Sequence, residues 1–208
     1  GDLVQRIEER LKSVSTLDPS RPAKPFWPSS AQRYCTSDMK RDPIHKHQRS
    51  LGSHGIIISC QGMRAEESKK RAEKLPLTLE KRISSERYKG LSPEEAVEIY
   101  NGEGRIVLNW LPIHDWKVGQ VWEQNGTSEG DLKHRQEMYR RGEAARALDG
   151  WPGHVAYVFG NERLSCALCV LASVGDLCNG MKHNPELFDR YVKLEQESTY
   201  TFRDGFSL

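Results

Sequence analysis

The sequence predicts an α/β fold, and three observations carry that prediction. Residues 56–58 form a short β-branched run typical of a buried strand, and the run leads to a turn at Gly62 and a charged helix start. A second short strand is predicted over residues 105–110, which contain an Ile-Val-Leu run after a glycine turn. Amphipathic helices are predicted over residues 2–14 and from Asn184 onward, because apolar residues recur there at helical spacing.

Length and composition narrow the functional classes. With 208 residues the chain is long enough to bury a hydrophobic core, and one domain is the expected organisation. The net charge of +2 gives no general argument for nucleic-acid binding, although residues 69–71 and 140–141 are short basic clusters. No long apolar run and no signal peptide are present, so we expect no membrane partner. The odd number of cysteines does not fit a secreted disulfide framework and favours a cytoplasmic protein with thiol or metal chemistry.

Proline and helix-capping residues mark the boundaries of the other predicted elements. Residues 15–30 contain repeated prolines and predict an irregular loop anchored by its aromatic pair, Phe26 and Trp27. In the next segment Ser37 or Asp38 is expected to cap a helix that Pro43 keeps short. Further expectations are a basic helical segment reaching residue 89, a helix capped by Ser92, a helix over 117–124, helical stretches within 127–148 and a loop over 151–154.

The segment over residues 55–71 is the first candidate site. A strand that ends in a glycine turn before a helix opens on a crevice, and the backbone N–H groups of a helix start favour anions. Arg64 and Arg71 suit a phosphate or sulfate, because guanidinium groups donate in a planar, bidentate manner. The alternative is a surface turn with solvated charges.

The cysteines are the second candidate site. Cys166 and Cys169 form a C-x-x-C pair that we expect on a buried helix, where they would chelate a metal or cluster or act as a redox dithiol. Cys35 lies among cationic residues that favour its thiolate. Cys178 would lie on the opposite face of an unbroken helix and would join the pair only if the helix breaks near Gly175. The alternative is that all the cysteines are buried structural residues.

Four segments, in order, resemble motifs of phosphoadenosine phosphosulfate (PAPS) reductase-like proteins. Residues 33–44 resemble their R-x-C-T-x-x-x-K-x-x-P segment, and residues 62–71 resemble their G-x-R-x-x-E-S-x-x-R motif. Residues 111–116, followed by Val-Trp at 121–122, are similar to their P-x-x-D-W…V-W segment. Residues 160–169 resemble the G-x-x-R-x-x-C-x-x-C of the phage-type and DNA-phosphorothioation branches. One such motif would be weak, but four in the family's order are specific.

The resemblance implies a fold, a substrate and a cofactor. The fold would be Rossmann-like, a parallel sheet flanked by helices of the adenine nucleotide α-hydrolase type, with a helical cysteine-containing part over residues 151–208. The substrate would be PAPS or APS to be reduced, or ATP used in sulfur transfer. The residues implied to bind phosphate or sulfate are Arg33, Lys40, Arg64, Glu67, Ser68 and Arg71. The residues implied to face a [4Fe–4S] cluster, or zinc instead, are Cys35, Cys166 and Cys169, with Cys178 as the first candidate for a fourth ligand and Cys60 as the second.

Two departures from the family pattern change the expected role. The S-G-G-K-D-S pyrophosphate loop does not occur in the 208 residues, so the chain resembles the C-terminal portion of one such domain, lacking its first strands. A preceding segment or a second chain would supply that loop, and the chain alone is expected to bind nucleotide poorly and to be inactive. The E-C-G-L-H segment of the assimilatory reductases is also absent, which weakens thioredoxin-dependent reduction and favours a sulfur-transfer or nucleotide-activating role. DNA and a thiol protein are both candidate partners. A non-catalytic docking subunit and a zinc-stabilised binding module are the competing hypotheses.

Overall fold

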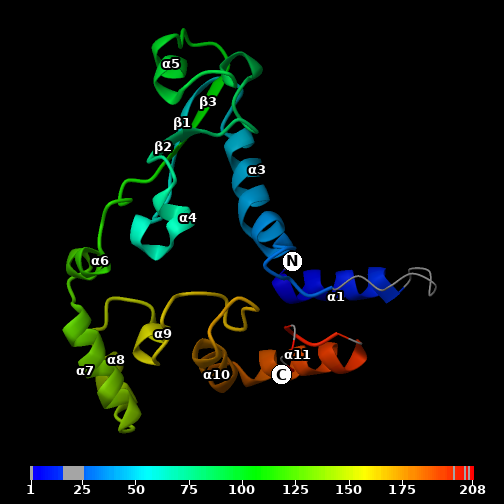
Figure 1. Ribbon diagram of the computed structural model, residues 1–208, viewed down its shortest axis with the longest axis vertical. Helices are drawn as coiled ribbons and strands as arrows, with labels where there is room; N and C mark the ends of the chain where they lie inside the picture. The colour runs from blue at the N-terminus through cyan, green and yellow to red at the C-terminus, as the bar shows by residue number, and fades with distance from the viewer. Residues whose placement is uncertain (1, 16–25, 199, 204, 206) are drawn as a thin grey trace. The chain divides into compact units, whose positions relative to one another are not determined.

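The computed structural model describes residues 2–15, 26–198, 200–203, 205 and 207–208 (Figure 1). The chain divides into two compact units, which are described separately. Unit 1 comprises Gly1–Met39 and Asn125–Leu208, and unit 2 comprises Lys40–Gln124. The prediction that the chain is a portion of one family domain stays a prediction.

Unit 2 is built on a three-stranded sheet in the order β1-β3-β2. β1 (Gly55–Cys60) and β3 (Arg105–Trp110) are the two predicted strands and pair in parallel, and β2 (Leu77–Leu79) pairs antiparallel with β3. The predicted basic helix up to residue 89 is wrong. It is replaced by α4 (Lys69–Ala72), β2 and the 3-10 turn η3 (Glu86–Tyr88). Pro76 explains the difference, because it ends helical structure and its carbonyl accepts the backbone N–H of Leu111, 2.8 Å away.

One face of this sheet carries the core of unit 2. Ile106 and Leu108 of β3 pack with Tyr88 of η3 and Ala96 of α5 (Pro93–Glu98). The predicted cap of α5 is confirmed, since the Ser92 hydroxyl accepts the backbone N–H of Glu95 and the Glu95 carboxylate accepts that of Ser92. These contacts fix the short helix against the sheet.

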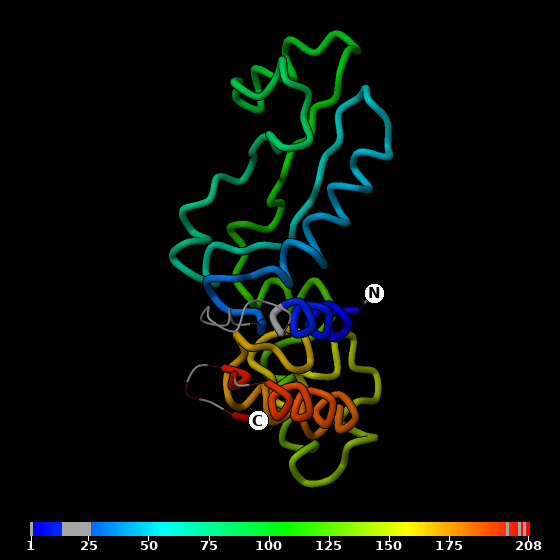
Figure 2. Tube along the Cα trace, turned by 90° about the vertical axis from the view of Figure 1, so that its right-hand side faces the viewer, coloured from blue at the N-terminus to red at the C-terminus, as the bar shows by residue number. Residues whose placement is uncertain are grey.

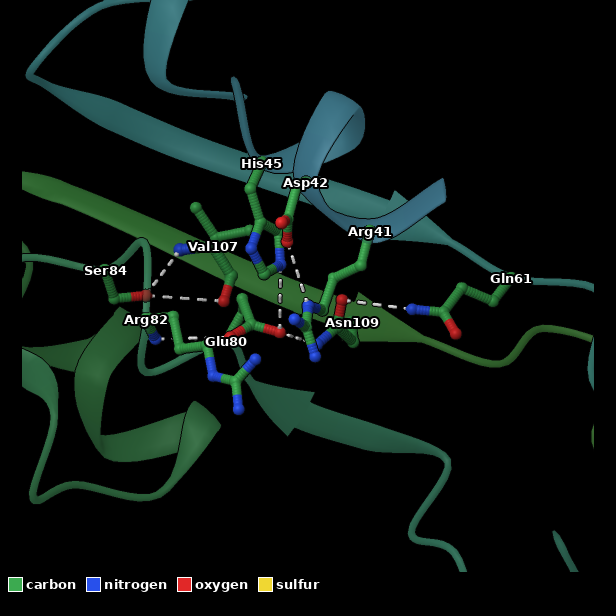
Figure 3. A network of polar contacts seen from close by, with 9 residues as sticks. All are labelled: Arg41, Asp42, His45, Gln61, Glu80, Arg82, Ser84, Val107 and Asn109. Atoms are coloured by element: carbon green, nitrogen blue, oxygen red, sulfur yellow. Dashed lines mark hydrogen bonds and ion pairs between the residues drawn. The ribbon is translucent and has the colours of Figure 1, made fainter. Parts of the chain in front are cut away.

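A polar network lies between α3 (Asp42–Ser50) and the sheet (Figure 3). His45 is 7% exposed, and its Nε2 lies 3.7 Å from Oε2 of Glu80. The Asn109 amide donates to the same carboxylate over 3.2 Å, and the Gln61 amide donates to Oδ1 of Asn109 over 3.2 Å. The network therefore links α3 to the carboxyl end of β1.

The prediction that β1 is buried is wrong. Its side chains alternate between half-buried and exposed, with Ile56 41% and Ile58 58% exposed. The physical reason is its place in the sheet: β1 is an edge strand whose strand partner is β3, and the face that carries Ile56 and Ile58 is only partly covered. A β-branched run identifies a strand without showing how many neighbours cover it.

Gly104 controls the turn that leads into β3, and replacing it should destabilise unit 2. Its φ is +74°, and an added Cβ would lie 3.0 Å from Ser85 Oγ and 3.3 Å from the Tyr88 ring. Gly102 also has a positive φ of +91° but has open space around it. We expect Gly104→Ala to lower the free energy of unfolding by about 2–3 kcal/mol and Gly102→Ala by about 1 kcal/mol, because only the first adds crowding to backbone strain. Urea unfolding measures both, and equal losses would show that crowding at Gly104 is unimportant.

Unit 1 is helical, and α1 (Leu3–Ser15), α10 (Val174–His183) and α11 (Pro185–Glu197) contribute to its core. The predicted first and last helices are therefore confirmed. Arg190 of α11 donates to Glu8 of α1 over 2.7 Å, and Figures 1 and 2 show the two helices in the same part of unit 1. The core cluster itself consists of Val4, Ile7, Phe26, Trp27, Tyr34, Leu168, Val170, Ala172, Leu177, Tyr191, Leu194 and Phe202.

The aromatic pair after the proline-rich segment is anchored as predicted. Phe26 is fully buried and Trp27 is 3% exposed, and both belong to the core cluster of unit 1. Most of the predicted proline-rich loop, residues 16–25, lies outside the described residues.

A continuous helical stretch follows, made of α2 (Tyr34–Thr36), the π-helical turn η1 (Ser37–Arg41) and α3. The prediction that Ser37 or Asp38 caps a helix is wrong, since both lie inside this stretch. Pro43 stands in the first turn of α3 and cannot donate to the carbonyl of Met39. A wider π turn before it accommodates the missing bond, and such turns are frequent at functional sites.

The remaining predicted helices are present. They are α6 (Val118–Gln124) in unit 2, and α7 (Glu129–Arg140) and α8 (Ala144–Leu148) in unit 1. The short helix α9 (Val155–Val158), also in unit 1, was not predicted. The predicted loop is confirmed over residues 151–153, and His154 caps α9. No helix among the described residues is long and apolar enough to span a membrane.

Candidate functional site

The loops that follow β1 and β3 meet at the carboxyl edge of the parallel pair. The backbone N–H of Ala65 donates to the His114 carbonyl over 2.8 Å, and the His114 ring contacts the Arg71 carbonyl at 3.0 Å through Nε2. The backbone N–H of Val118 donates to the Glu66 carboxylate over 2.7 Å. Two segments far apart in the sequence are thus joined where α/β proteins hold ligands. We call residues 61–71 and 111–118 the strand-end loops.

The two arginines of the candidate anion site lie in the first of these loops. Arg64, whose side chain is 14% exposed, pairs with the Glu66 carboxylate and lies 3.9 Å from that of Glu67. Arg71, whose side chain is 45% exposed, pairs with the Glu67 carboxylate. The carboxylates hold the guanidinium groups close together, so an entering anion meets oriented donors and must compete with two glutamates.

The electrostatics of the loops follow from these pairs. The hydrogen bond from Arg64 lowers the pKa of Glu66 despite the opposing effect of its desolvation, so this carboxylate is charged at neutral pH. Lys117 reaches the same carboxylate at 3.9 Å. Ser68 lies between the arginines in sequence and its side chain makes no capping hydrogen bond to α4. Over both strand-end loops, five basic residues (Arg64, Lys69, Lys70, Arg71 and Lys117) outnumber three acidic ones (Glu66, Glu67 and Asp115) by two charges.

His114 and Lys117 were not among the predicted site residues. The ring of His114, 7% exposed, ties the second loop to the first. The sequence signal for it was available, because His114 precedes the Asp-Trp pair of the third family-like segment. Its role is invisible without the structure, since the contact joins residues 43 positions apart.

Arg33 and Lys40 come from another part of the chain. Arg33 is the N-cap residue of α2 in unit 1, and Lys40 lies in η1 at the start of unit 2. Their contribution to the anion site stays a prediction, as does the proximity of the cysteines to it.

The C-x-x-C pair lies in a turn, so the prediction of a buried helix there is wrong. Cys166 and Cys169 stand in a non-helical segment, and α10 begins only at Val174. The Ser173 hydroxyl accepts the backbone N–H of Asp176 over 3.1 Å and caps the helix. This Ser-x-x-Asp pattern was the missed signal for the later helix start. Leu168, Val170 and Leu177 are buried as predicted, whereas Val174 is 53% exposed.

Three of the cysteines lie around the same hydrophobic core of unit 1. Cys169 packs against the cluster that contains Tyr34, which precedes Cys35 in sequence. Burial raises the pKa of Tyr191 in that cluster, and the nearby thiols of Cys166 and Cys169 raise it further. The structure therefore brings Cys166 and Cys169 to one neighbourhood, and Cys35 directly follows a core residue of the same cluster. Among the described residues, no three His, Cys, Asp or Glu side chains converge tightly enough to hold a metal ion.

The cationic surroundings of Cys35 include a residue that the sequence did not indicate. The guanidinium carbon of Arg10, from α1, lies 4.1 Å from the centroid of the Tyr34 ring. Arg6 of the same helix donates to the Asp38 carboxylate over 2.9 Å. Amphipathic spacing placed α1 in the core but could not show that its basic face meets this segment.

The other two cysteines are placed differently. Cys178 is exposed on α10, about 200° around the helix from Gly180, which faces the C-x-x-C turn. Cys60 is exposed at the end of β1, in unit 2. The assignment of either as a fourth ligand stays a prediction.

A comparison with known protein families gives a match that covers most of the chain. The phosphoadenosine phosphosulfate reductase domain matches residues 3–176, which include all four family-like segments. Searches of curated proteins and of solved structures give no match. The chain therefore belongs to the phosphoadenosine phosphosulfate reductase domain family.

Proposed function

We propose that the chain acts in sulfur metabolism on an adenylyl nucleotide, either PAPS or APS in a reduction or ATP in sulfur transfer. The observation that carries the proposal is the joining of the strand-end loops around Arg64 and Arg71. Guanidinium groups at the carboxyl edge of a parallel pair suit the phosphate or sulfate end of such a nucleotide. Glu67 acts on the anion indirectly, by holding both arginines.

An iron–sulfur cluster is the proposed cofactor, and the donor chemistry fits it. Thiolates are the ligands that Fe–S clusters require, and zinc accepts the same set. Cys166, Cys169 and Cys35 would hold the group, since all three lie around one core. When bound, a [4Fe–4S] cluster would supply an electron-transfer centre or a Lewis-acid site. The protein's own contribution is to present the C-x-x-C pair on an accessible turn.

Anaerobic purification followed by iron and acid-labile sulfide analysis tests the cofactor. We expect a brown protein that loses its iron when Cys166 or Cys169 is replaced by serine. A colourless protein without iron would refute the cluster, and stoichiometric zinc in its place would make the site structural. Titration with PAPS, APS and ATP then identifies the nucleotide, because only one of them should bind markedly more tightly than inorganic sulfate.

A second candidate function is a docking subunit, with a partner chain supplying the pyrophosphate loop. The observation that favours it is the place of β1 at the edge of the described sheet, with β3 as its strand partner and Ile56 and Ile58 exposed on one face. Exposed edges of this kind pair readily with another strand. Size-exclusion chromatography with light scattering, together with nucleotide titration, decides between the two. A monomer that binds PAPS or ATP tightly by itself would exclude the docking function.

A further inference from the structure

One face of α10 contacts the segment that leads into the C-x-x-C pair. The residues at positions 176, 179, 180 and 183 recur at helical spacing and so lie on one side of the helix. Along that side, the backbone N–H of Glu162 donates to the Asp176 carboxylate over 2.9 Å, and the Asn179 amide donates to Asn161 over 3.1 Å. Further along, the His183 ring stacks on Phe159 with centroids 3.8 Å apart. Residues 159–162 are thus attached to α10 at three points.

The turn itself touches the same face at Gly180. Gly180 is buried, and a Cβ added there would lie 1.9 Å from the carbonyl oxygen of Ala167 and 2.9 Å from its carbonyl carbon. Ala167 stands between the two cysteines. Both clashing atoms are backbone, so a side chain at position 180 would push the whole turn away from the helix. Only glycine permits the observed position.

Arginine side chains hold the far end of the turn. The Arg203 guanidinium donates to the Ala172 carbonyl over 3.0 Å, and that of Arg163 donates to the Leu171 carbonyl. Two consecutive carbonyl groups just after Cys169 are therefore satisfied by cations. Together with the Ser173 cap, these contacts fix where the turn ends and α10 begins.

From these contacts we infer that Gly180 and Arg203 are positioning residues for the dithiol formed by Cys166 and Cys169. They fix the backbone of the turn that carries both thiols before any metal binds. A soft, thiophilic centre is the chemical class of ligand that such a thiol pair takes. Because the turn is ordered by protein contacts, the pair is preorganised and little entropy is lost on chelation. This inference rests on the proposed metal-binding role of the pair and adds to it the residues that create the geometry.

A trivalent arsenical tests the pair without the other proposed ligands. Phenylarsine oxide condenses with two thiols, forming two S–As bonds and releasing one water, with no change in oxidation state. The full chain, reduced and with Cys35, Cys60 and Cys178 replaced by serine, is titrated against a soluble dithiol competitor and the adduct is read by mass spectrometry. We expect tight binding, and a loss of about tenfold in affinity for Gly180→Ala, because preorganisation is lost.

Gly175→Ala is the matched control. It places the same methyl group in the same helix, where the nearest atom would be Ser173 Oγ at 3.9 Å, an ordinary contact. We expect it to bind the arsenical as the parent protein does. Should Gly180→Ala also bind as the parent does, the positioning role is refuted.

If circular dichroism shows that Gly180→Ala does not fold, the Arg203→Met variant provides the test instead. This change removes the donor to Ala172 and retains an apolar stem, and we expect a several-fold loss of arsenical affinity. Unchanged affinity would refute the inference for Arg203. A parent protein that binds the arsenical but never takes up iron or zinc would refute the proposed cofactor and leave the positioning role intact.

Discussion

Replacing Trp27 by alanine should lower the free energy of unfolding of unit 1 by about 3–5 kcal/mol, the range for removing a large buried aromatic side chain. Trp27 is 3% exposed and stands at the centre of an aromatic cluster. Its ring centroid lies 4.7 Å from that of Phe26 and 5.3 Å from those of Tyr191 and Phe202. Its indole N–H donates to the Tyr200 carbonyl over 3.3 Å.

The Trp27→Ala substitution should also destabilise the segment that carries Cys35. The Tyr34 hydroxyl donates to the Phe26 carbonyl over 2.6 Å, so the segment before Cys35 is held by the same cluster. Chemical denaturation followed by circular dichroism measures the effect. Trp110→Ala is the control, because Trp110 is 44% exposed at the end of β3 and should cost less than about 1 kcal/mol. Equal losses in the two variants would mean that Trp27 does not organise the core.

Replacing Arg64 by alanine should weaken binding of PAPS or ATP by about 1–3 kcal/mol, roughly 5- to 150-fold, if its guanidinium contacts phosphate or sulfate. Arg64 is the less exposed arginine of the strand-end loops, so its charge is less screened by water than that of Arg71. The loss should be mainly in affinity, with the fold intact, because Arg64 lies outside the core cluster of unit 2.

Arg87→Ala separates this effect from a general loss of positive charge. Arg87 lies in the same unit, has a 43% exposed side chain and pairs with Glu103 at 3.1 Å, away from the strand-end loops. Isothermal titration gives the comparison, with parent and variants each tested in the complete domain that includes the pyrophosphate loop. If Arg64→Ala and Arg87→Ala bind nucleotide equally well, Arg64 is a surface residue.

The sequence predicted the elements that local chemistry determines. The strand over residues 105–110, the capping box at Ser92 and Glu95, and the last helix after Asn184 all carry their own start or stop signals, and all are present. β2 was missed because a three-residue strand has no periodicity of its own and forms only through its pairing with β3.

At the C-x-x-C turn and at the strand-end loops, the features that the sequence did not predict depend on tertiary contacts. The C-x-x-C pair was placed on a helix because apolar residues around it recur at helical spacing. Leu168 and Val170 are instead buried from a turn packed against Gly180, and Val174 of the same set is 53% exposed. The Arg64 and Arg71 positions followed from the strand end, but their pairing with Glu66 and Glu67 depends on how the loop folds back. The contacts of His114 depend on the meeting of two loops.

The most direct test of the central claim is a nuclear magnetic resonance titration of the ¹⁵N-labelled chain with PAPS and, separately, with pyrophosphate. Amide shifts report weak binding residue by residue, so the measurement works even if the chain binds nucleotide poorly. We predict that residues 61–71 and 111–118 shift together and saturate with one affinity, since their backbones are hydrogen-bonded to each other. Saturable shifts confined to other regions, with both strand-end loops unmoved, would contradict the account.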